Sequence, residues 1–352
     1  MLKFNKTRNK VLSAIFIIIV VAAFFLTPTG YYLEVPGTAE DTSQFVKVDG
    51  KHDKKKGNLL LTTVGIIQGT PFTLLKSLGN NFETIYSQKD LMGDENSQQY
   101  FKVQQYYMKS AQNSAVQAAY SKADKPFTKK YLGVYVMDVM SNSDFKKKLE
   151  IGDTITSING YHFNNADQFI KYVRKQDKHS TVKISFLRDG KKKMASGKLV
   201  RLADTKRFGL GITLTDDTEA EGNPPTKIDA GQIGGPSAGL MFTIQVYSQV
   251  ANKDLKAGRT IAGTGTIAPD GTVGPIGGIE KKIYAASEEG ATIFFAPDDP
   301  VTKEIKKYEP GYVNNYHLAL RAAKKLHTKM KIVPVKNLND AINYLEKTKQ
   351  SK

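Results

Sequence analysis

The sequence contains no cysteine. This absence excludes disulfide-bonded scaffolds, cysteine proteases and metal sites with thiolate ligands such as zinc fingers. It does not decide whether the protein lies in a reducing or an oxidising compartment, because an exported protein does not need disulfides. Glycine and proline, at 29 and 13 of 352 residues, are too few for a collagen-like or low-complexity chain. We therefore expect most of the chain to fold, as two units plus a membrane or targeting segment at this length.

Acidic residues are also in deficit. The chain has 34 of them against 51 basic residues, which gives a formal net charge of +17. Such an excess raises the question whether nucleic acid or another anionic partner binds the protein. Lysine runs at 54–56, 146–148 and 191–193 contribute to it. We interpret these runs as solvated surface, with attraction to anionic lipid or wall polymer as the alternative.

The first thirty residues have the layout of a membrane-targeting segment. Residues 1–10 carry four basic residues and no acid, and residues 11–26 carry no charge. The length of this run fits both a short transmembrane helix and a cleaved signal peptide. Because no A-x-A-like cleavage site follows, we favour an uncleaved anchor in membrane lipid, with its N-terminus inside and everything after Tyr31 outside. Nucleic acid is then not an expected partner.

The rest of the chain mixes strand and helix patterns and contains no second apolar span, no internal repeat and no coiled-coil heptads. Residues 57–68 predict one or two strands, and residues 95–122 predict a helix that ends before Lys125-Pro126. Residues 131–200 predict a compact β-rich module with a short helix over 166–175. Residues 208–347 alternate between the two patterns, which is typical of an α/β or α+β core.

The β-rich module resembles a PDZ domain. The segment Tyr131-Leu132-Gly133-Val134 stands where that family has its carboxylate-binding loop, and LxxGDxIxxING over 149–160 is the matching central signature. The resemblance implies that backbone groups of Leu132, Gly133 and Val134 bind a peptide, and that the strand beginning at Val134 offers it a free edge. The alternative is a vestigial groove in a module that only spaces or docks other parts.

Glycine concentrates in two clusters that each run into a predicted helix. The first, Gly234 to Gly239, places Ser237 at the start of an apolar helix. Unpaired N–H groups there can stabilise an oxyanion beside the hydroxyl, although a serine at a helix start is most often an N-cap. The second, Gly274 to Gly278, turns into a helix with lysines in its first turn. A lysine in an apolar pocket there loses solvation, its pKa falls, and it can accept a serine proton.

Both clusters together resemble the proteolytic domain of the Lon family over about residues 208–347. The shared motifs are GPSAG, which carries the nucleophile, and PIGG-x-x-x-K, which carries the base. The resemblance implies that Ser237 is the nucleophile and that Lys282, not Lys281, is the general base of a Ser/Lys dyad. It also implies that the hydroxyl of Thr264 holds the lysine. A histidine-based triad has little support, because the five histidines are scattered along the sequence.

The same resemblance implies that Gly235 and Ala238 contact the substrate, and backbone N–H groups near Ser237 are expected to bind the oxyanion. It implies no metal and no cofactor. Gly234 stands where many members of the family have an acidic residue. The sequence therefore does not decide whether a third residue assists the dyad. The sequence has no GxxxxGK[ST] phosphate loop, so the ATP-driven unfoldase of full Lon is absent and cleavage is expected without ATP.

In this order, the segments resemble a group of membrane-anchored PDZ and Lon-like serine proteases of Gram-positive bacteria. The expected domains are the cytoplasmic flank and anchor at 1–30, an N-terminal part of the protease unit at 31–125, a PDZ domain at 126–205 and a Lon-like domain at 206–352. The expected fold class is α+β, with an N-terminal transmembrane helix, a PDZ-like β-rich module and a Lon-type proteolytic domain.

The sequence thus predicts an ATP-independent cell-surface endopeptidase that cleaves extracellular peptides or unstructured proteins, with the PDZ domain recognising the substrate. A homo-oligomer is consistent with the rings that Lon-like domains commonly form. Two alternatives remain. One is a proteolytically inactive, PDZ-bearing membrane adaptor, and the other is a basic surface protein that binds wall polymer.

Overall fold

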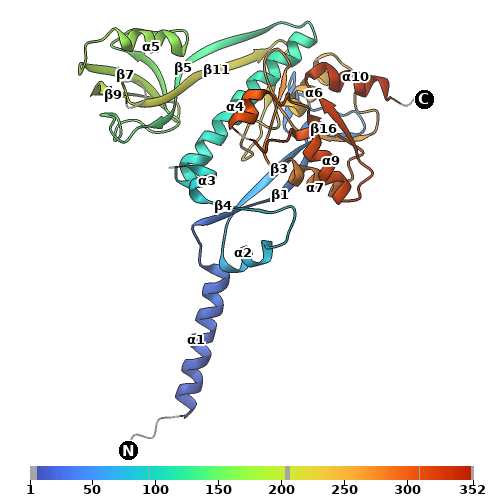
Figure 1. Cartoon of the computed structure of the whole chain (residues 1–352). Helices are drawn as coiled ribbons and strands as arrows, with labels where there is room; N and C mark the ends of the chain where they lie inside the picture. The colour runs from blue at the N-terminus through green and yellow to red at the C-terminus, as the bar shows by residue number, and fades with distance from the viewer. Residues whose placement is uncertain (1–5, 94, 203–206, 309, 350–352) are drawn as a thin grey trace, which may run out of the picture.

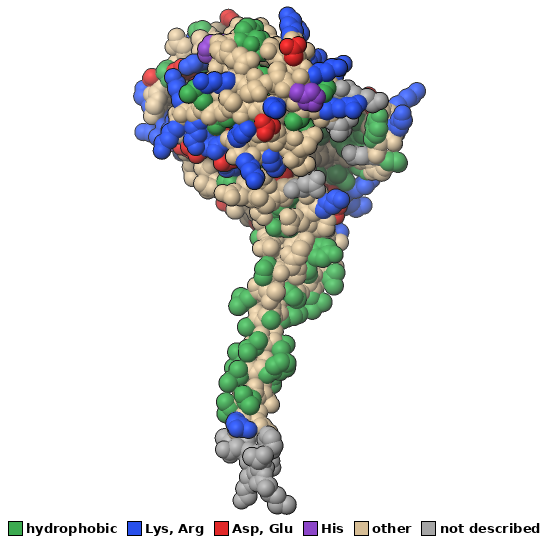
Figure 2. All heavy atoms as spheres, turned by 90° about the vertical axis from the view of Figure 1, so that its left-hand side faces the viewer, with side chains coloured by type: hydrophobic (Ala, Val, Ile, Leu, Met, Phe, Trp, Pro, Cys, Tyr) green, Lys and Arg blue, Asp and Glu red, His purple; other side chains and the backbone are tan. Residues whose placement is uncertain are grey.

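The computed structural model describes residues 6–93, 95–202, 207–308 and 310–349. The chain begins with the helix α1 (Lys6–Leu26), which extends away from the folded body as a stalk (Figure 1). Residues 8–26 of this helix are exposed, and they are long and apolar enough to cross a membrane or to serve as a signal sequence. Figure 2 shows its hydrophobic side chains along the stalk.

The main body is built on a six-stranded sheet with the order β17-β16-β13-β3-β1-β4. Three of its strands come from the start of the chain and three from its end. They are β1 (Tyr31–Asp41), β3 (Asn58–Gln68), β4 (Thr84–Ser87), β13 (Thr260–Gly263), β16 (Ile293–Pro297) and β17 (Lys331–Val335). The two groups meet where β3 pairs parallel with β13, with Leu61 opposite Gly263. Residues before and after the β-rich module therefore share one sheet.

Helices cover both faces of this sheet. Successive residues of a strand point to opposite faces, and the central strands carry apolar residues on both, so each face needs a covering layer. On one face, Leu59, Leu61 and Phe295 pack with the helices α4 (Ser97–Lys122), α6 (Gly239–Val250) and α10 (Leu338–Lys347). On the other face, Leu60 and Phe294 pack with α7 (Ile279–Glu288) and α9 (Asn315–Lys325). The predicted helix at 95–122 is confirmed as α4.

The β-rich module forms a separate five-stranded sheet with the order β11-β5-β6-β7-β8. Its strands are β5 (Phe127–Val139), β6 (Thr154–Ile158), β7 (Thr181–Arg188), β8 (Lys191–Lys198) and β11 (Ile212–Gly222). The helix α5 (Ala166–Arg174) confirms the helix predicted there and closes a core of its own around Phe145, Ile155 and Phe186. In Figure 1 this sheet lies at the end of the molecule opposite α1.

The expectation of a free edge at Val134 is wrong. The strand β11, which follows the module, pairs antiparallel with β5 along its length, with Asp216 opposite Val134 and Asp217 opposite Gly133. The strand β6 occupies the other side, with Ile155 opposite Val134. Both edges of β5 are thus used at this point, because residues 212–222 form an 11-residue strand that satisfies the backbone groups of β5.

Shorter elements complete the described fold. They are η1 (Thr42–Gln44), β2 (Val46–Val48), α2 (Pro71–Ser77), α3 (Gln88–Met92), β9 (Val200–Arg201), β10 (Phe208–Gly209), β12 (Thr226–Ile228), β14 (Thr266–Ile267), β15 (Val273–Gly274) and α8 (Lys303–Tyr308).

Candidate active site

Ser237 lies in a tight loop that leads into α6 and passes close to α4. The Gly235 N–H donates to the backbone carbonyl of Gln104 on α4, with an N···O distance of 2.8 Å. A side chain at Gly234 would bring its Cβ to 2.9 Å from the Cβ of Gln104, and Gly235 has φ +83°. The glycines of this loop are therefore required by the close approach of α4 and by the backbone conformation.

Two donors fix the peptide that follows Ser237. The Thr264 hydroxyl donates to the Ser237 carbonyl at 3.0 Å, and the Gly265 N–H donates to the same oxygen at 2.9 Å. The resemblance implied that Thr264 holds Lys282, but the structure gives its hydroxyl the backbone of Ser237 as partner. Thr264 thus orients the serine and not the lysine.

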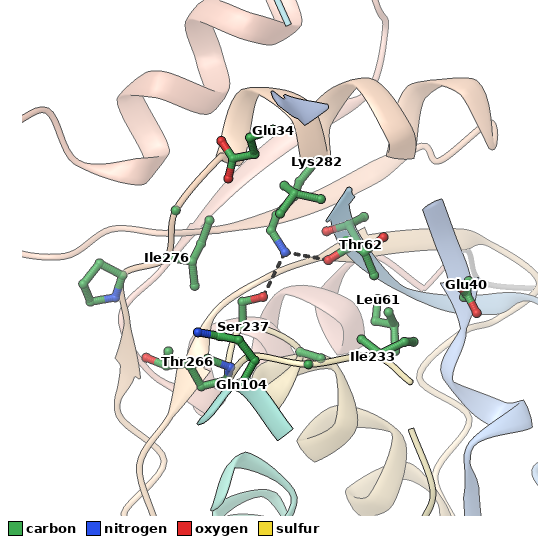
Figure 3. Close-up of a pocket in the computed structure, with 18 of the residues that line it drawn as sticks. Glu34, Glu40, Leu61, Thr62, Gln104, Ile233, Ser237, Thr266, Ile276 and Lys282 are labelled. Carbon is green, nitrogen blue, oxygen red and sulfur yellow. Dashed lines mark hydrogen bonds between the residues drawn. The ribbon is translucent and has the colours of Figure 1, made fainter. Parts of the chain in front are cut away.

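Lys282 projects from the first turn of α7 toward Ser237 (Figure 3). Its Nζ lies 2.9 Å from the Ser237 Oγ and 2.6 Å from the carbonyl oxygen of Thr62 on β3. The side chain is buried, with an exposed fraction of 2% for the residue. Gly278, at φ +65°, starts the helix, and a Cβ there would approach Val64 at 2.9 Å. The tight turn therefore lets α7 begin close against β3.

The environment of Lys282 favours its neutral form. Burial lowers the pKa of Lys282 from its ordinary value to about 8, against the opposing influence of the Glu34 carboxylate. An ammonium group in such a place loses hydration that the single carbonyl of Thr62 replaces only in part. With a pKa of about 8, about one Lys282 in ten is unprotonated at pH 7, and this neutral amine can accept the hydroxyl proton of Ser237.

The neighbouring Lys281 has a different environment. Its Nζ forms an ion pair with Glu34 at 2.8 Å and donates to the Thr84 hydroxyl at 2.8 Å. Glu34 and Thr84 belong to β1 and β4, so Lys281 ties α7 to the N-terminal strands. Of the two lysines, it is Lys282 that the structure brings to Ser237.

Backbone donors for an oxyanion remain beside Ser237. The N–H of Gly235, a predicted substrate-binding residue, is already bonded to the carbonyl of Gln104. Within the described part of the chain, the N–H groups of Ser237 and Ala238 have no backbone acceptor. Both lie at the N-terminal end of α6, where N–H groups attract negative charge.

The space in front of Ser237 is a cleft of about 740 Å³. Its walls come from β1, β3, the first turns of α4, the Ser237 loop and the turn before α7. Its apolar lining includes Leu61, Val64, Ile233 and Ile276. Figure 3 shows Ser237 and Lys282 facing into it. A cleft of this size accommodates several residues of an extended peptide. No group of His, Asp and Glu residues that could hold a metal ion occurs among the described residues.

The sequence reasoning missed residues whose contribution is a backbone atom or a distant pairing. The Thr62 carbonyl lies 220 positions before Lys282, and no side-chain pattern marks it. Gln104 also acts through its carbonyl. Leu132, Gly133 and Val134, the predicted peptide-binding residues, lie within β5 and are not among the residues that line the cleft.

Comparisons with known proteins identify both modules. Residues 103–199 match the family described as PDZ domain, and residues 228–345 match the Lon protease (S16) C-terminal proteolytic domain. These matches confirm the predicted α+β chain with a PDZ-like module and a Lon-type domain. None of the curated proteins compared with the chain matches it.

Solved structures similar to the chain include two PDZ domains of SdrC-like proteins. The PDZ domain of the SdrC-like protein from Listeria monocytogenes is 37% identical, with a TM-score of 0.23, over 24% of this chain and 88% of that one. The corresponding domain from Listeria innocua is 34% identical, with a TM-score of 0.23, over 24% and 93% of the two chains. A solution structure from Geobacillus thermodenitrificans is 36% identical, with a TM-score of 0.21, over 23% and 94%. The chain therefore contains one region that matches the PDZ domain and a second region that matches the Lon-type (S16) proteolytic domain.

Proposed function

We propose that the protein is a serine endopeptidase that uses a Ser/Lys dyad and needs no ATP. The observation that supports this most directly is the 2.9 Å contact between the Ser237 hydroxyl and the Lys282 amine at the floor of an open cleft. A buried lysine with a lowered pKa is the kind of base that activates a serine hydroxyl. The absence of a phosphate-loop motif supports the ATP independence.

In the proposed reaction, neutral Lys282 removes the proton of Ser237 as the Oγ attacks the scissile carbonyl. The tetrahedral oxyanion accepts hydrogen bonds from the N–H groups of Ser237 and Ala238. The protonated Lys282, held by the Thr62 carbonyl, then gives its proton to the leaving amine. Water attacks the acyl-enzyme by the same route, with Lys282 again taking a proton, and restores Ser237.

We further propose that α1 anchors the enzyme and that the catalytic domain lies on the extracellular side. The four basic residues among the first ten, and the uncharged run over residues 11–26, support this orientation. Substrates are then extracellular peptides or unstructured proteins, since the enzyme has no means of unfolding a compact one. If the PDZ domain recognises them through β5, the peptide must first displace β11.

The test is hydrolysis of an unstructured protein by the purified full-length chain without nucleotide. We expect turnover by the wild type, and its loss in Ser237→Ala and Lys282→Met with the circular dichroism spectrum unchanged. Lys325→Met, which removes an exposed lysine of α9, is the matched control and should retain activity. A wild-type chain that binds peptides but does not cleave them would support the adaptor alternative instead.

A further inference from the structure

The end of α1 is packed against the folded body. The ring of Phe25 lies 4.5 Å from that of Phe72 on α2, and the ring of Phe24 lies 6.2 Å from it. Just beyond the helix, the N–H and hydroxyl of Thr29 both bond the Gly69 carbonyl, at 2.8 and 2.7 Å. The last turn of α1 and the helix α2 are therefore held together by ring contacts and backbone hydrogen bonds.

The outer face of α2 is apolar and exposed. Phe72, Leu75 and Leu78 recur at intervals of three, and they are 37%, 61% and 68% exposed. Ile67, at the end of β3, continues this face and is 44% exposed. We call these four residues the α2 face. Figure 2 shows hydrophobic side chains that continue from the stalk onto the neck of the molecule.

The inner side of α2 has a different role. Leu74 points toward the body, where its Cδ2 lies 3.0 Å from the position that a Cβ on Gly69 would take. The capping box formed by Thr70 and Thr73 fixes the start of the helix. The apolar α2 face is therefore presented outward by a helix that is already held in place.

The depth of α2 follows from its contacts with α1. The candidate span Arg8–Leu26 has 19 residues, about 28 Å of helix. Its uncharged part, residues 11–26, is about 24 Å long, which places it at the short end for the roughly 30 Å of bilayer hydrocarbon. Phe24 and Phe25 in its last turn then lie at the outer boundary of the hydrocarbon. Phe72, whose ring contacts both, must lie at the same depth.

We propose that the α2 face binds the lipid surface of the bilayer that α1 spans. The helix α2 then lies in the headgroup region with Phe72, Leu75 and Leu78 toward the acyl chains, as in interfacial helices. Exposed Lys76 on the same helix reaches the phosphates, and Tyr31, 49% exposed, suits the same boundary. The proposal rests on the retention of α1 in the membrane, which belongs to the proposed function, and it is independent of the chemistry at Ser237.

Because the chain has no cysteine, single labels can be placed without background. Leu75→Cys and Leu78→Cys report on the α2 face, and Met194→Cys on β8, 66% exposed, is the control at the far sheet. Val20→Cys reports on α1 itself. Each full-length variant is labelled with an environment-sensitive fluorophore and reconstituted into phosphatidylcholine–phosphatidylglycerol vesicles with nitroxides near the top of the acyl chains.

We expect a blue shift and loss of most of the fluorescence at positions 75 and 78, and neither change at 194. Quenching at position 20 with none at 75 and 78 would overturn the lipid contact while leaving the anchor intact. Absence of quenching at position 20 would instead refute the anchor, and the lipid contact with it. A blue shift at 75 that grows with protein density, without quenching, would mean that a second copy covers the face, which also overturns the proposal.

Discussion

Lys281 is ion-paired with Glu34 at 2.8 Å, and it directly precedes the lysine that contacts Ser237. Lys281 is itself buried, with an exposed fraction of 5%. The pair therefore places a carboxylate and its counterion beside Lys282, whose pKa the same carboxylate tends to raise against the larger effect of burial. Other titratable groups around this part of the cleft are Glu40, Tyr86, Tyr100 and Glu280.

The ion pair predicts opposite effects for its two members. Lys281→Met leaves Glu34 without a counterion, so the carboxylate stabilises charged Lys282 and raises the pKa of Lys282. The acidic limb of the profile of kcat/KM against pH should then shift to higher pH by about one unit. Glu34→Gln should move that limb down. The measurement is kcat/KM against pH for both variants, with Lys325→Met as the control. Shifts in the same direction would show that the variants act through the fold and not through charge.

The wild-type enzyme should lose activity as the pH falls through about 8, where Lys282 takes up a proton. Only the neutral amine accepts a proton, so kcat/KM should rise with pH across this range and then level off. Lys282→Arg should be inactive at every accessible pH, because a guanidinium does not deprotonate. A profile that is flat from pH 6 to 9 would exclude Lys282 as the base.

Short sequence motifs predicted the two candidate catalytic residues, but they did not predict the contacts between segments that are distant in the sequence. GPSAG and PIGG-x-x-x-K are local in sequence, and the structure brings Ser237 and Lys282 together across 45 positions. Lys282 donates to the Thr62 carbonyl, and the Thr264 hydroxyl donates to the Ser237 carbonyl. Both contacts depend on how distant segments pack, and no residue type in the sequence indicates them. The pairing of β11 with β5 depends on strand register, which alternating residues alone do not fix.

Gly133→Val is expected to destabilise the PDZ sheet and not merely to block a groove. Gly133 has φ +151°, and an added Cβ would lie 2.4 Å from the Ile155 carbonyl oxygen. Backbone strain of this kind costs about 2 kcal/mol, before the clash is counted. Chemical denaturation should show the loss. Gly190→Asn is the matched control, since Gly190 has φ +74° with open space around it and asparagine adopts that region.

Peptide binding to β5 should depend on how firmly β11 is held. The Tyr106 hydroxyl on α4 donates to the Asp216 carbonyl of β11 at 2.6 Å. Tyr106→Phe removes that bond, so a larger fraction of molecules has β5 accessible and the apparent affinity for a peptide should rise several-fold. Fluorescence anisotropy with a labelled peptide ending in a free carboxylate measures this. Unchanged affinity would place peptide recognition elsewhere on the protein.

The proposed membrane orientation predicts that the C-terminus lies outside the cell. An epitope placed after Lys352 should be removed by protease added to intact cells, and the protein should stay with the membrane fraction. A shortened protein recovered from the medium would instead favour a cleaved signal segment.

The candidate active site depends on the strand β3, which lies outside the region that matches the Lon family. This strand pairs with β13 and supplies the carbonyl that binds Lys282, yet it lies far outside residues 228–345. A cut anywhere between β3 and the PDZ sheet would divide these contacts between two polypeptides that are held together only by noncovalent interactions. A C-terminal fragment separated from β3 would lose the carbonyl that binds Lys282, so we expect the fragment alone to be inactive. If α1 anchors the enzyme as proposed, peptide hydrolysis would then be limited to the neighbourhood of the membrane.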